Sequence, residues 1–324
     1  MRYIGIDISK DTFMVAFPEG KGFRTQSYRN TAASIRSFIK ELKPGEDQCV
    51  MEATGNYSMM LLYLLKKSGI DASLLNPRQS KYFAKTLMSI VKTDKVDACL
   101  LAEYGIRMKP PVFTLPDDAI ILLKQKRTVL RQFRQQLTAL RNVQHSLDVL
   151  PVKDKSSIHA LRQAIKQLSK HIEELEKDII DTSDDKFKTQ MKRLQTIKGI
   201  GATLAASLII ATSGFSCFDN AKQVSRYLGL CPTYQQSGTS IHIKGHISRT
   251  GDSHIRGQLY LAAMSAIRCN TACKELYTRL RTNGKSGRLA LVAVGNKLVR
   301  QAFAVVRNDK DYQDGFVSEP PKKI

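Results

Sequence analysis

The feature that most constrains this chain is a run of aliphatic residues that recur at alternating intervals of three and four. The run consists of Ile158, Leu161, Ile165, Leu168, Ile172, Leu175 and Ile179. The same register holds upstream at Leu130, Phe133, Leu137, Leu140 and Leu147. Such heptads predict long helices that bury their apolar stripes in a coiled coil. Because Pro151 separates the two stretches and glycine is absent from 106–198, we expect two long helices that form a hairpin or pair with another chain.

The segment before the heptads alternates between strand and helix patterns. Runs rich in β-branched, aliphatic and aromatic residues predict strands at 3–8, 12–17, 23–28, 49–52 and 70–75. Apolar residues at helical spacing, or a helix-starting signal, predict helices at 31–43, 56–67, from 76 and at 93–108. Three early strands followed by this alternation predict an α/β domain with a mixed sheet and helices on its faces.

The segment after the heptads predicts a second globular unit. Residues 190–308 are mostly helical in pattern, with a loop or hairpin at 231–248. We therefore expect an α/β domain at 1–110, a coiled-coil region at 111–188 and a mostly α-helical domain at 189–308. A charged, proline-containing tail at 309–324 is expected to be flexible.

The charge of the chain is strongly positive. Lys and Arg number 51 against 29 Asp and Glu, a net charge of +22. A folded protein this basic usually binds a polyanion, most often nucleic acid. The excess is greatest in residues 191–324, with 20 basic and 7 acidic side chains, so the strongest phosphate-binding surface is expected there. The candidate nucleic-acid contacts are Arg78, Lys81, Lys85, Lys198, Lys244, Arg249 and Arg256.

Several features bear on the location of the protein. No apolar run approaches the roughly 18 residues of a membrane span, and Asp7 interrupts the N-terminus before a signal segment could form. The six cysteines include no CxxC pair. We therefore expect reduced thiols in a cytoplasmic protein that associates with the nucleoid when active and has no membrane partner.

Four acidic residues form the first candidate site. Asp7 and Glu52 end predicted strands, and Asp94 and Asp97 lie three residues apart at the start of a predicted helix. Carboxylates that converge in this way suit Mg²⁺ or Mn²⁺, and two such ions could clamp a phosphodiester. Helix capping and ordinary ion pairs are the plain alternatives for each residue alone. The set and its order favour the ribonuclease-H-like nuclease fold over actin-like ATPases and sugar kinases, because no later Asp-Gly-Gly phosphate loop follows.

A serine in the most basic region forms the second candidate site. Ser237 precedes Gly238 in the predicted loop, with Lys244, Arg249 and Arg256 nearby in sequence. A serine can attack a phosphodiester when cations stabilise the transition state and the leaving oxygen. An ordinary Ser-Gly turn is the plain alternative.

The order of several motifs resembles one protein family. The motifs are Ile4-Gly5-Ile6-Asp7, Met51-Glu52-Ala53-Thr54-Gly55, Asn76-Pro77, Thr93-Asp94-Lys95-Val96-Asp97, Gly199-Ile200-Gly201, Tyr227-Leu228-Gly229-Leu230, Gln236-Ser237-Gly238 and Ile247-Ser248-Arg249-Thr250-Gly251. In this order, across roughly residues 1–300, they resemble the DEDD transposases of insertion sequences, which are related to the Piv and MooV site-specific invertases.

The resemblance implies a fold, a set of catalytic residues and partners. It implies a RuvC-like domain in which Asp7, Glu52, Asp94 and Asp97 bind Mg²⁺, with Mn²⁺ as a possible substitute. It implies that Ser237 is the nucleophile and forms a phosphoserine link to DNA, with Ser248 as the less favoured candidate. It further implies a homo-oligomer, a dimer or tetramer with composite active sites, that uses a noncoding bridge RNA to choose donor and target DNA. The alternatives from other classes are a RuvC-like metal nuclease that uses water and a non-enzymatic nucleic-acid-binding protein.

Overall fold

The chain folds into two compact units, Met1–Leu115 and the residues from Pro116 on. The computed structural model describes residues 1–88, 92–182, 184–237, 241–248 and 250–315. Within these ranges, residues 234–237 and 241–246 are described by their backbone alone. Each unit has its own hydrophobic core.

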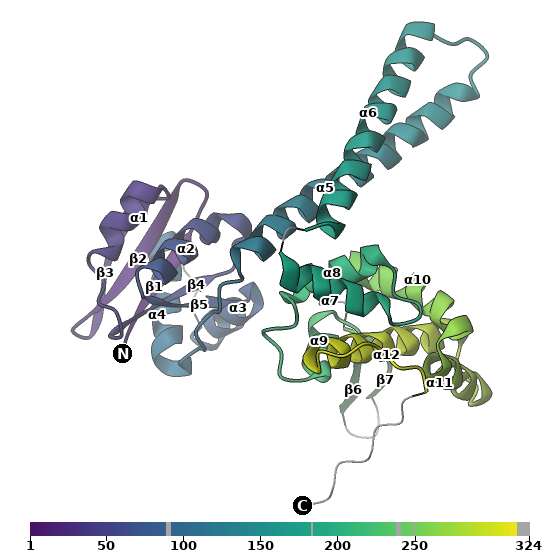
Figure 1. The fold of residues 1–324 in the computed structure, drawn as a ribbon. Coiled ribbons are helices and arrows are strands. Elements are labelled where there is room, and N and C mark those ends of the chain that lie inside the picture. The colour runs from purple at the N-terminus through teal and green to yellow at the C-terminus, as the bar shows by residue number, and fades with distance from the viewer. Residues whose placement is uncertain (89–91, 183, 238–240, 249, 316–324) are drawn as a thin grey trace, which may run out of the picture. The chain divides into compact units, whose positions relative to one another are not determined.

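The first unit is built on a five-stranded mixed sheet (Figure 1). The strands are β1 (Arg2–Ile8), β2 (Thr12–Glu19), β3 (Gly22–Arg29), β4 (Asp47–Glu52) and β5 (Asp71–Leu75), in the order β3-β2-β1-β4-β5. The first three strands form an antiparallel meander, whereas β4 and β5 run parallel to β1. This arrangement confirms the predicted α/β class and its mixed sheet.

Helices cover both faces of this sheet. One face packs against α1 (Ala32–Ile39) and α2 (Met59–Lys67), which follows a 3₁₀ turn at Gly55–Ser58. The other face packs against α4 (Asp94–Met108), beside which lies α3 (Pro77–Thr86). Side chains alternate along β1, so Ile4, Ile6 and Ile8 face α1 and α2 while the residues between them face α4.

The second unit begins with the helices that the heptads predict. They are α5 (Asp118–Asp148) and α6 (Lys155–Ile180), which lie side by side as a hairpin. Leu130, Leu137, Ile172 and Ile179 are buried in the hairpin. The ion pairs that join the helices include Arg134–Glu176, Lys126–Asp178 and Arg162–Asp148. The hydrophobic core continues from this hairpin into the helices that follow.

The rest of the unit is a helical bundle with one β-hairpin. Its elements are α7 (Asp185–Gln195), α8 (Ala202–Thr212), α9 (Ala221–Tyr227), β6 (Pro232–Ser237), β7 (Ile241–Ile247), α10 (Ser253–Cys269), α11 (Thr271–Thr282) and α12 (Gly287–Arg307). Among the described helices, α12 alone is long and apolar enough by composition to cross a membrane. Its apolar residues, including Val294 and Leu298, are buried in the core, which makes α12 a central helix of the bundle.

Residues 309–315, expected as the start of a flexible tail, are held against the bundle. The Tyr312 hydroxyl donates to Asn270 Oδ1 at 3.1 Å, and Lys198 pairs with Asp314 at 3.0 Å. The amide of Tyr312 also donates to Thr196 Oγ1 at 2.8 Å. Composition alone suggested fraying here, but these contacts use a few polar groups placed to meet partners far away in the chain.

Candidate active site

Asp7 occupies the face of the sheet that α4 covers. It follows Gly5 by two residues on β1, so the two residues lie on the same face. Gly5 pairs with Val50 of β4, and Val50 packs against Leu101 of α4. Glu52, two residues after Val50 at the end of β4, therefore shares this face. The parallel pairing of β1 and β4 brings the two acids to the same edge of the sheet.

Small residues let α4 approach β1 very closely. A Cβ atom on Gly5 would lie 1.9 Å from the carbonyl oxygen of Ala98 and 2.4 Å from the amide nitrogen of Ala102. A Cβ atom on Gly105 would lie 2.7 Å from Cβ of Tyr3. Along α4, residue 105 thus lies over residue 3, and residues 98–102 lie over residue 5. The first turn, with Asp94 and Asp97, therefore extends toward Asp7.

Helix α3 brings a basic surface to Glu52. The Ser80 hydroxyl donates to Glu52 Oε2 at 2.5 Å. The helix starts directly after β5 because Asn76 and Gln79 form a capping box and Pro77 occupies the first turn. The predicted contacts Arg78, Lys81 and Lys85 are all exposed on this helix.

Electrostatics shows that the four carboxylates interact. Burial, together with repulsion from Asp97, Asp94 and Glu52, raises the pKa of Asp7 to about 6. Burial also raises the pKa of Asp97, where Lys92 opposes the shift and Asp94 and Glu52 add to it. In the described part of the chain none of the four acids forms an ion pair. Lys92 offsets part of the negative charge of this acidic cluster, but no ion pair within the described residues neutralises it.

Asp47, another acid of the same sheet, provides a comparison because its carboxylate is paired with a cation. Asp47, at the other end of β4, accepts bonds of 2.7 Å from both Nε and Nη2 of Arg2 and one of 2.8 Å from the Lys43 amide. Burial opposes ionisation of Asp47, but these bonds outweigh it and hold the pKa of Asp47 below its usual value. The fold therefore pairs Asp47 with Arg2, whereas none of the four acids of the cluster has an ion pair with a described residue.

The chemistry of this cluster fits a divalent cation. It offers only carboxylate oxygens, the hard ligands that Mg²⁺ and Mn²⁺ prefer, and a cation would remove the repulsion that raises the pKa of Asp7. Across the described residues, no three His, Cys, Asp or Glu side chains converge closely enough to hold an ion as they stand. Binding would therefore require the carboxylates to rotate inward.

The second candidate site lies on the hairpin of β6 and β7. Ser237 is the last residue of β6 and pairs with Ile241 of β7, so its backbone lies beside the turn. The side chains of Ser237 and Lys244, and the whole of Arg249, lie outside the described residues. The amide of Ser248 donates to the Cys231 carbonyl at 3.1 Å, and its hydroxyl lies 2.9 Å from that of Thr250.

A contact between two glycines joins the segments on either side of this hairpin. Gly229 has φ +72°, and a Cβ atom there would lie 2.8 Å from the amide nitrogen of Gly251. A Cβ atom on Gly251 would lie 2.4 Å from the Tyr227 carbonyl oxygen. Arg256 Nη1 donates to the carbonyls of Gly251 and Leu228 at 2.6 and 3.4 Å. Arg256 was predicted as a nucleic-acid contact. One nitrogen of its guanidinium instead donates hydrogen bonds that hold together the segments at the base of the hairpin.

Two other predicted features also have structural partners. Lys198, a predicted phosphate contact, is paired with Asp314. In the Gly199-Ile200-Gly201 turn, Gly199 has φ +107°, and a Cβ atom there would lie 2.7 Å from that of Ala266. The turn therefore packs tightly against α10.

Sequence reasoning missed the residues that arrange these sites. Ser80 and the packing partners Ala98 and Ala102 were not singled out. The spacing of Ala98, Ala102 and Gly105 was a signal, because small residues four or three apart on a helix permit close packing. The partner of Ser80 depends on the crossing of two elements, which no local pattern reports.

The fold and the acidic cluster together define a class of protein. A five-stranded mixed sheet with acids on β1, on β4 and on the helix across one face has the architecture of a ribonuclease-H-like nuclease domain. The transposase family model for the DEDD domain of IS110 elements matches residues 4–174. The model of the transposase IS116/IS110/IS902 family matches residues 191–278.

Relatives extend the match over nearly the whole chain. The pilin gene-inverting protein of Moraxella bovis is 29% identical over 322 residues, which cover 96% of this chain and 97% of that protein. The transposase for insertion sequence element IS1111A of Coxiella burnetii is 25% identical over 344 residues, which cover 97% and 92% of the two chains. The chain belongs to the IS110 family of DEDD transposases. It is an enzyme that cleaves and rejoins DNA, and its nuclease-like domain points to dependence on a divalent metal.

Proposed function

We propose that this transposase cuts DNA through a covalent bond to Ser237 and uses Mg²⁺ held by Asp7, Glu52, Asp94 and Asp97. The observation that supports the metal site is that burial, together with repulsion from Asp97, Asp94 and Glu52, raises the pKa of Asp7 to about 6. The serine is supported by its motif, by its position at the end of β6 and by the basic residues near it in the sequence.

Each group of site residues has a separate role in the proposed reaction. The Ser237 hydroxyl attacks a DNA phosphorus, the bond from phosphorus to the 3′ oxygen breaks, and a phosphoserine link forms. The 3′ oxygen takes up the proton that the serine loses and later attacks another phosphoserine to rejoin the strands. Mg²⁺, when bound, would supply positive charge that stabilises the negatively charged phosphate in the transition state. Arg78, Lys81 and Lys85 hold the DNA backbone beside the acids.

The partners follow from the same proposal. The protein works as a dimer or tetramer in which the acids of one subunit serve the serine of another, and a noncoding bridge RNA selects donor and target sites. RNA pairing would supply sequence choice while Lys and Arg grip phosphates without reading bases. The protein acts in the cytoplasm, at the nucleoid. The names of its relatives include both transposition and gene inversion, two outcomes of the same cutting and rejoining chemistry.

The test is a junction assay in cells. The gene is placed on a plasmid with its native flanking DNA, so that any guide RNA is also made, and recombined junctions are amplified. We expect junctions from wild type and from the matched controls Ser248→Ala and Glu103→Gln, and none from Ser237→Ala or Asp97→Asn. Glu103 lies on α4 like Asp97 but pairs with Arg107. Junctions that survive in Ser237→Ala and vanish in Ser248→Ala or Asp97→Asn would assign the attack to Ser248 or to water.

A further inference from the structure

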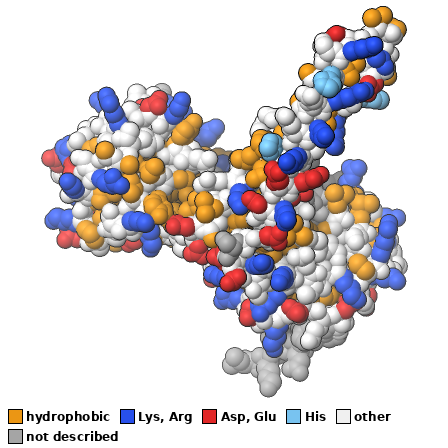
Figure 2. All heavy atoms as spheres, turned by 45° about the horizontal axis from the view of Figure 1, so that its top comes forward, with side chains coloured by type: hydrophobic (Ala, Val, Ile, Leu, Met, Phe, Trp, Pro, Cys, Tyr) orange, Lys and Arg blue, Asp and Glu red, His pale blue; other side chains and the backbone are white. Residues whose placement is uncertain are grey.

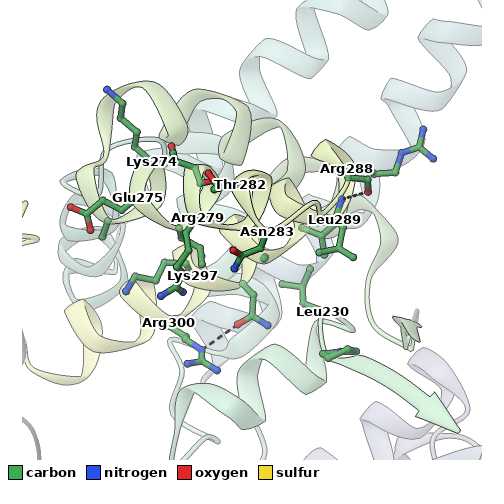
Figure 3. Close-up of a pocket in the computed structure, with 18 of the residues that line it drawn as sticks. Leu230, Lys274, Glu275, Arg279, Thr282, Asn283, Arg288, Leu289, Lys297 and Arg300 are labelled. Atoms are coloured by element: carbon green, nitrogen blue, oxygen red, sulfur yellow. Dashed lines mark hydrogen bonds between the residues drawn. The ribbon is translucent and has the colours of Figure 1, made fainter. Parts of the chain in front are cut away.

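A groove of about 1410 Å³ lies between α11 and α12 and reaches the base of the β6–β7 hairpin (Figure 3). Its floor is apolar and includes Leu276, Leu289 and Val292. Pro232, the first residue of β6, and Ile247, the last residue of β7, also line it. We call this cavity the α11–α12 groove.

Positive charge is concentrated in this groove. Five basic side chains and one acidic side chain, Glu275, line it. The five are Lys274, Arg279, Arg288, Lys297 and Arg300. Within the described chain none of the five forms an ion pair, although Lys198, Arg127 and Arg134 of the same unit do. Gathering like charges without counterions is unfavourable, so the arrangement is suited to a polyanion.

The position of the groove favours DNA as the polyanion that binds there. Its end wall is the base of the hairpin whose β6 strand ends at Ser237. Ser237 lies five residue steps after Pro232 along β6, or about 17 Å at roughly 3.3 Å per step. This length corresponds to about five nucleotide steps at the ~3.4 Å rise of a duplex strand. A strand that lies in the groove would therefore continue toward the serine within a few nucleotides.

We propose that the α11–α12 groove binds the phosphate backbone of the DNA strand that the chain cleaves. The identity of the bound strand as the cleaved strand rests on the function proposed for Ser237. The binding of DNA to the groove does not depend on that function. Arg279, Arg288 and Arg300 hold the phosphates from the two walls, while the apolar floor accommodates the sugars. These arginines add a DNA-binding surface distinct from α3.

The test compares two triple variants with the same loss of charge. The groove variant carries Arg279→Gln, Arg288→Gln and Arg300→Gln, all at exposed positions. The control carries Arg281→Gln, Lys285→Gln and Arg307→Gln, which lie on the same helices or their connection but do not line the groove. Binding is measured by fluorescence anisotropy with a labelled duplex of the native flanking DNA and with an RNA of equal length, at several salt concentrations. Both proteins also carry Ser237→Ala, so that no cleavage occurs.

We expect the groove variant to bind the duplex about tenfold or more weakly, with a salt slope smaller by about 2 to 3, because each phosphate contact contributes about 0.9. The control should change affinity by less than about threefold, and RNA binding should change equally in both. Equal losses of DNA affinity in both variants, or a loss confined to RNA, would overturn the proposal. The single variant Arg279→Gln, with an expected slope change of about 1, serves if the triple variant proves unstable to heat.

The outcome is separable from that of the proposed function. If DNA binding falls in the groove variant while Ser237→Ala still yields junctions in cells, the groove stands and only the serine assignment fails. If DNA binding is unchanged while Ser237→Ala abolishes junctions, the serine stands and the groove does not bind the cleaved strand.

Discussion

The carboxyl group of Asp7 is held in an environment that resists its ionisation. Burial and three neighbouring acids raise its pKa to about 6, whereas Asp47 in the same sheet is fully paired. A raised pKa means that the folded state favours the protonated form. Ionisation of Asp7 therefore does not destabilise the folded state below about pH 4. The cost in the free energy of unfolding develops as the pH rises from about 4 through about 6, and it persists at higher pH. A cation bound at the proposed metal site would offset this cost.

Asp7→Asn should stabilise the metal-free protein at pH 7.5. The expected gain is about 1 to 2 kcal/mol, after discounting the shift for partial solvent screening, and it should vanish near pH 4. The measurement is urea unfolding in EDTA across this pH range. Added Mg²⁺ should raise the stability of wild type and leave Asp7→Asn unchanged. A less stable variant at pH 7.5 would contradict the electrostatic account.

At the scale of elements, the acidic site depends on how closely α4 lies on β1. Gly5 packs against Ala98 and Ala102, and a methyl group added to Gly5 would meet backbone atoms of α4 that cannot rotate away. Gly105 packs against the side chain of Tyr3. The position of the first turn of α4 therefore depends on residues that carry no charge. In the second unit the same role belongs to Gly229 and Gly251 at the base of the hairpin.

Gly5→Ala should displace α4 and weaken the metal site without removing a carboxylate. We expect a loss of stability of about 1 to 3 kcal/mol from overpacking, together with a smaller Mg²⁺-dependent rise in melting temperature. Gly22→Ala is the matched control, because a Cβ atom there meets nothing within 4 Å. Melting curves with and without Mg²⁺ measure both effects. Equal Mg²⁺ responses in Gly5→Ala and wild type would show that the approach of α4 does not position the acids.

At the scale of the whole molecule, the apolar surface and the charge suggest an assembly on nucleic acid. The turn between α5 and α6 exposes Val149, Leu150 and Val152, with exposed fractions of 73%, 45% and 86%. Figure 2 shows hydrophobic side chains at the end of this hairpin among Lys and Arg. Exposed apolar side chains that lie together often mark a contact between proteins, which agrees with the proposed homo-oligomer.

Replacing Val149 and Val152 together by Ser should lower the oligomeric state. The apolar area that a second copy would cover is then lost, so sedimentation at micromolar concentration should shift toward monomer. Val129→Ser on α5, with an exposed fraction of 43%, is the matched control and should not change the oligomer. An unchanged sedimentation profile in the double variant would exclude the hairpin end as the contact.

Local patterns in the sequence predicted most elements and the acidic set. The strands of the sheet, the helices on its faces and the long helices with the heptads all follow from periodicity and breakers, which act over a few residues. The prediction that residues 190–308 are mostly helical did not identify α7 and α11 as separate helices. In α7, Phe187, Met191 and Leu194 have helical spacing and Asp184 caps the helix, so a signal existed. In α11 only Cys273 is buried, so its pattern was too weak to find.

By itself, the sequence determined the class of fold, the excess of positive charge and the residue types that the chemistry requires. These properties depend on neighbours in the chain and on composition. Only the tertiary structure decided that Gly5 lets α4 approach Asp7 and that Arg256 and Lys198 have partners within the protein. It also decided that five basic side chains, none of them in an ion pair with a described residue, share one groove. These properties depend on contacts between residues far apart in the chain, and such contacts arise from packing that no local pattern specifies.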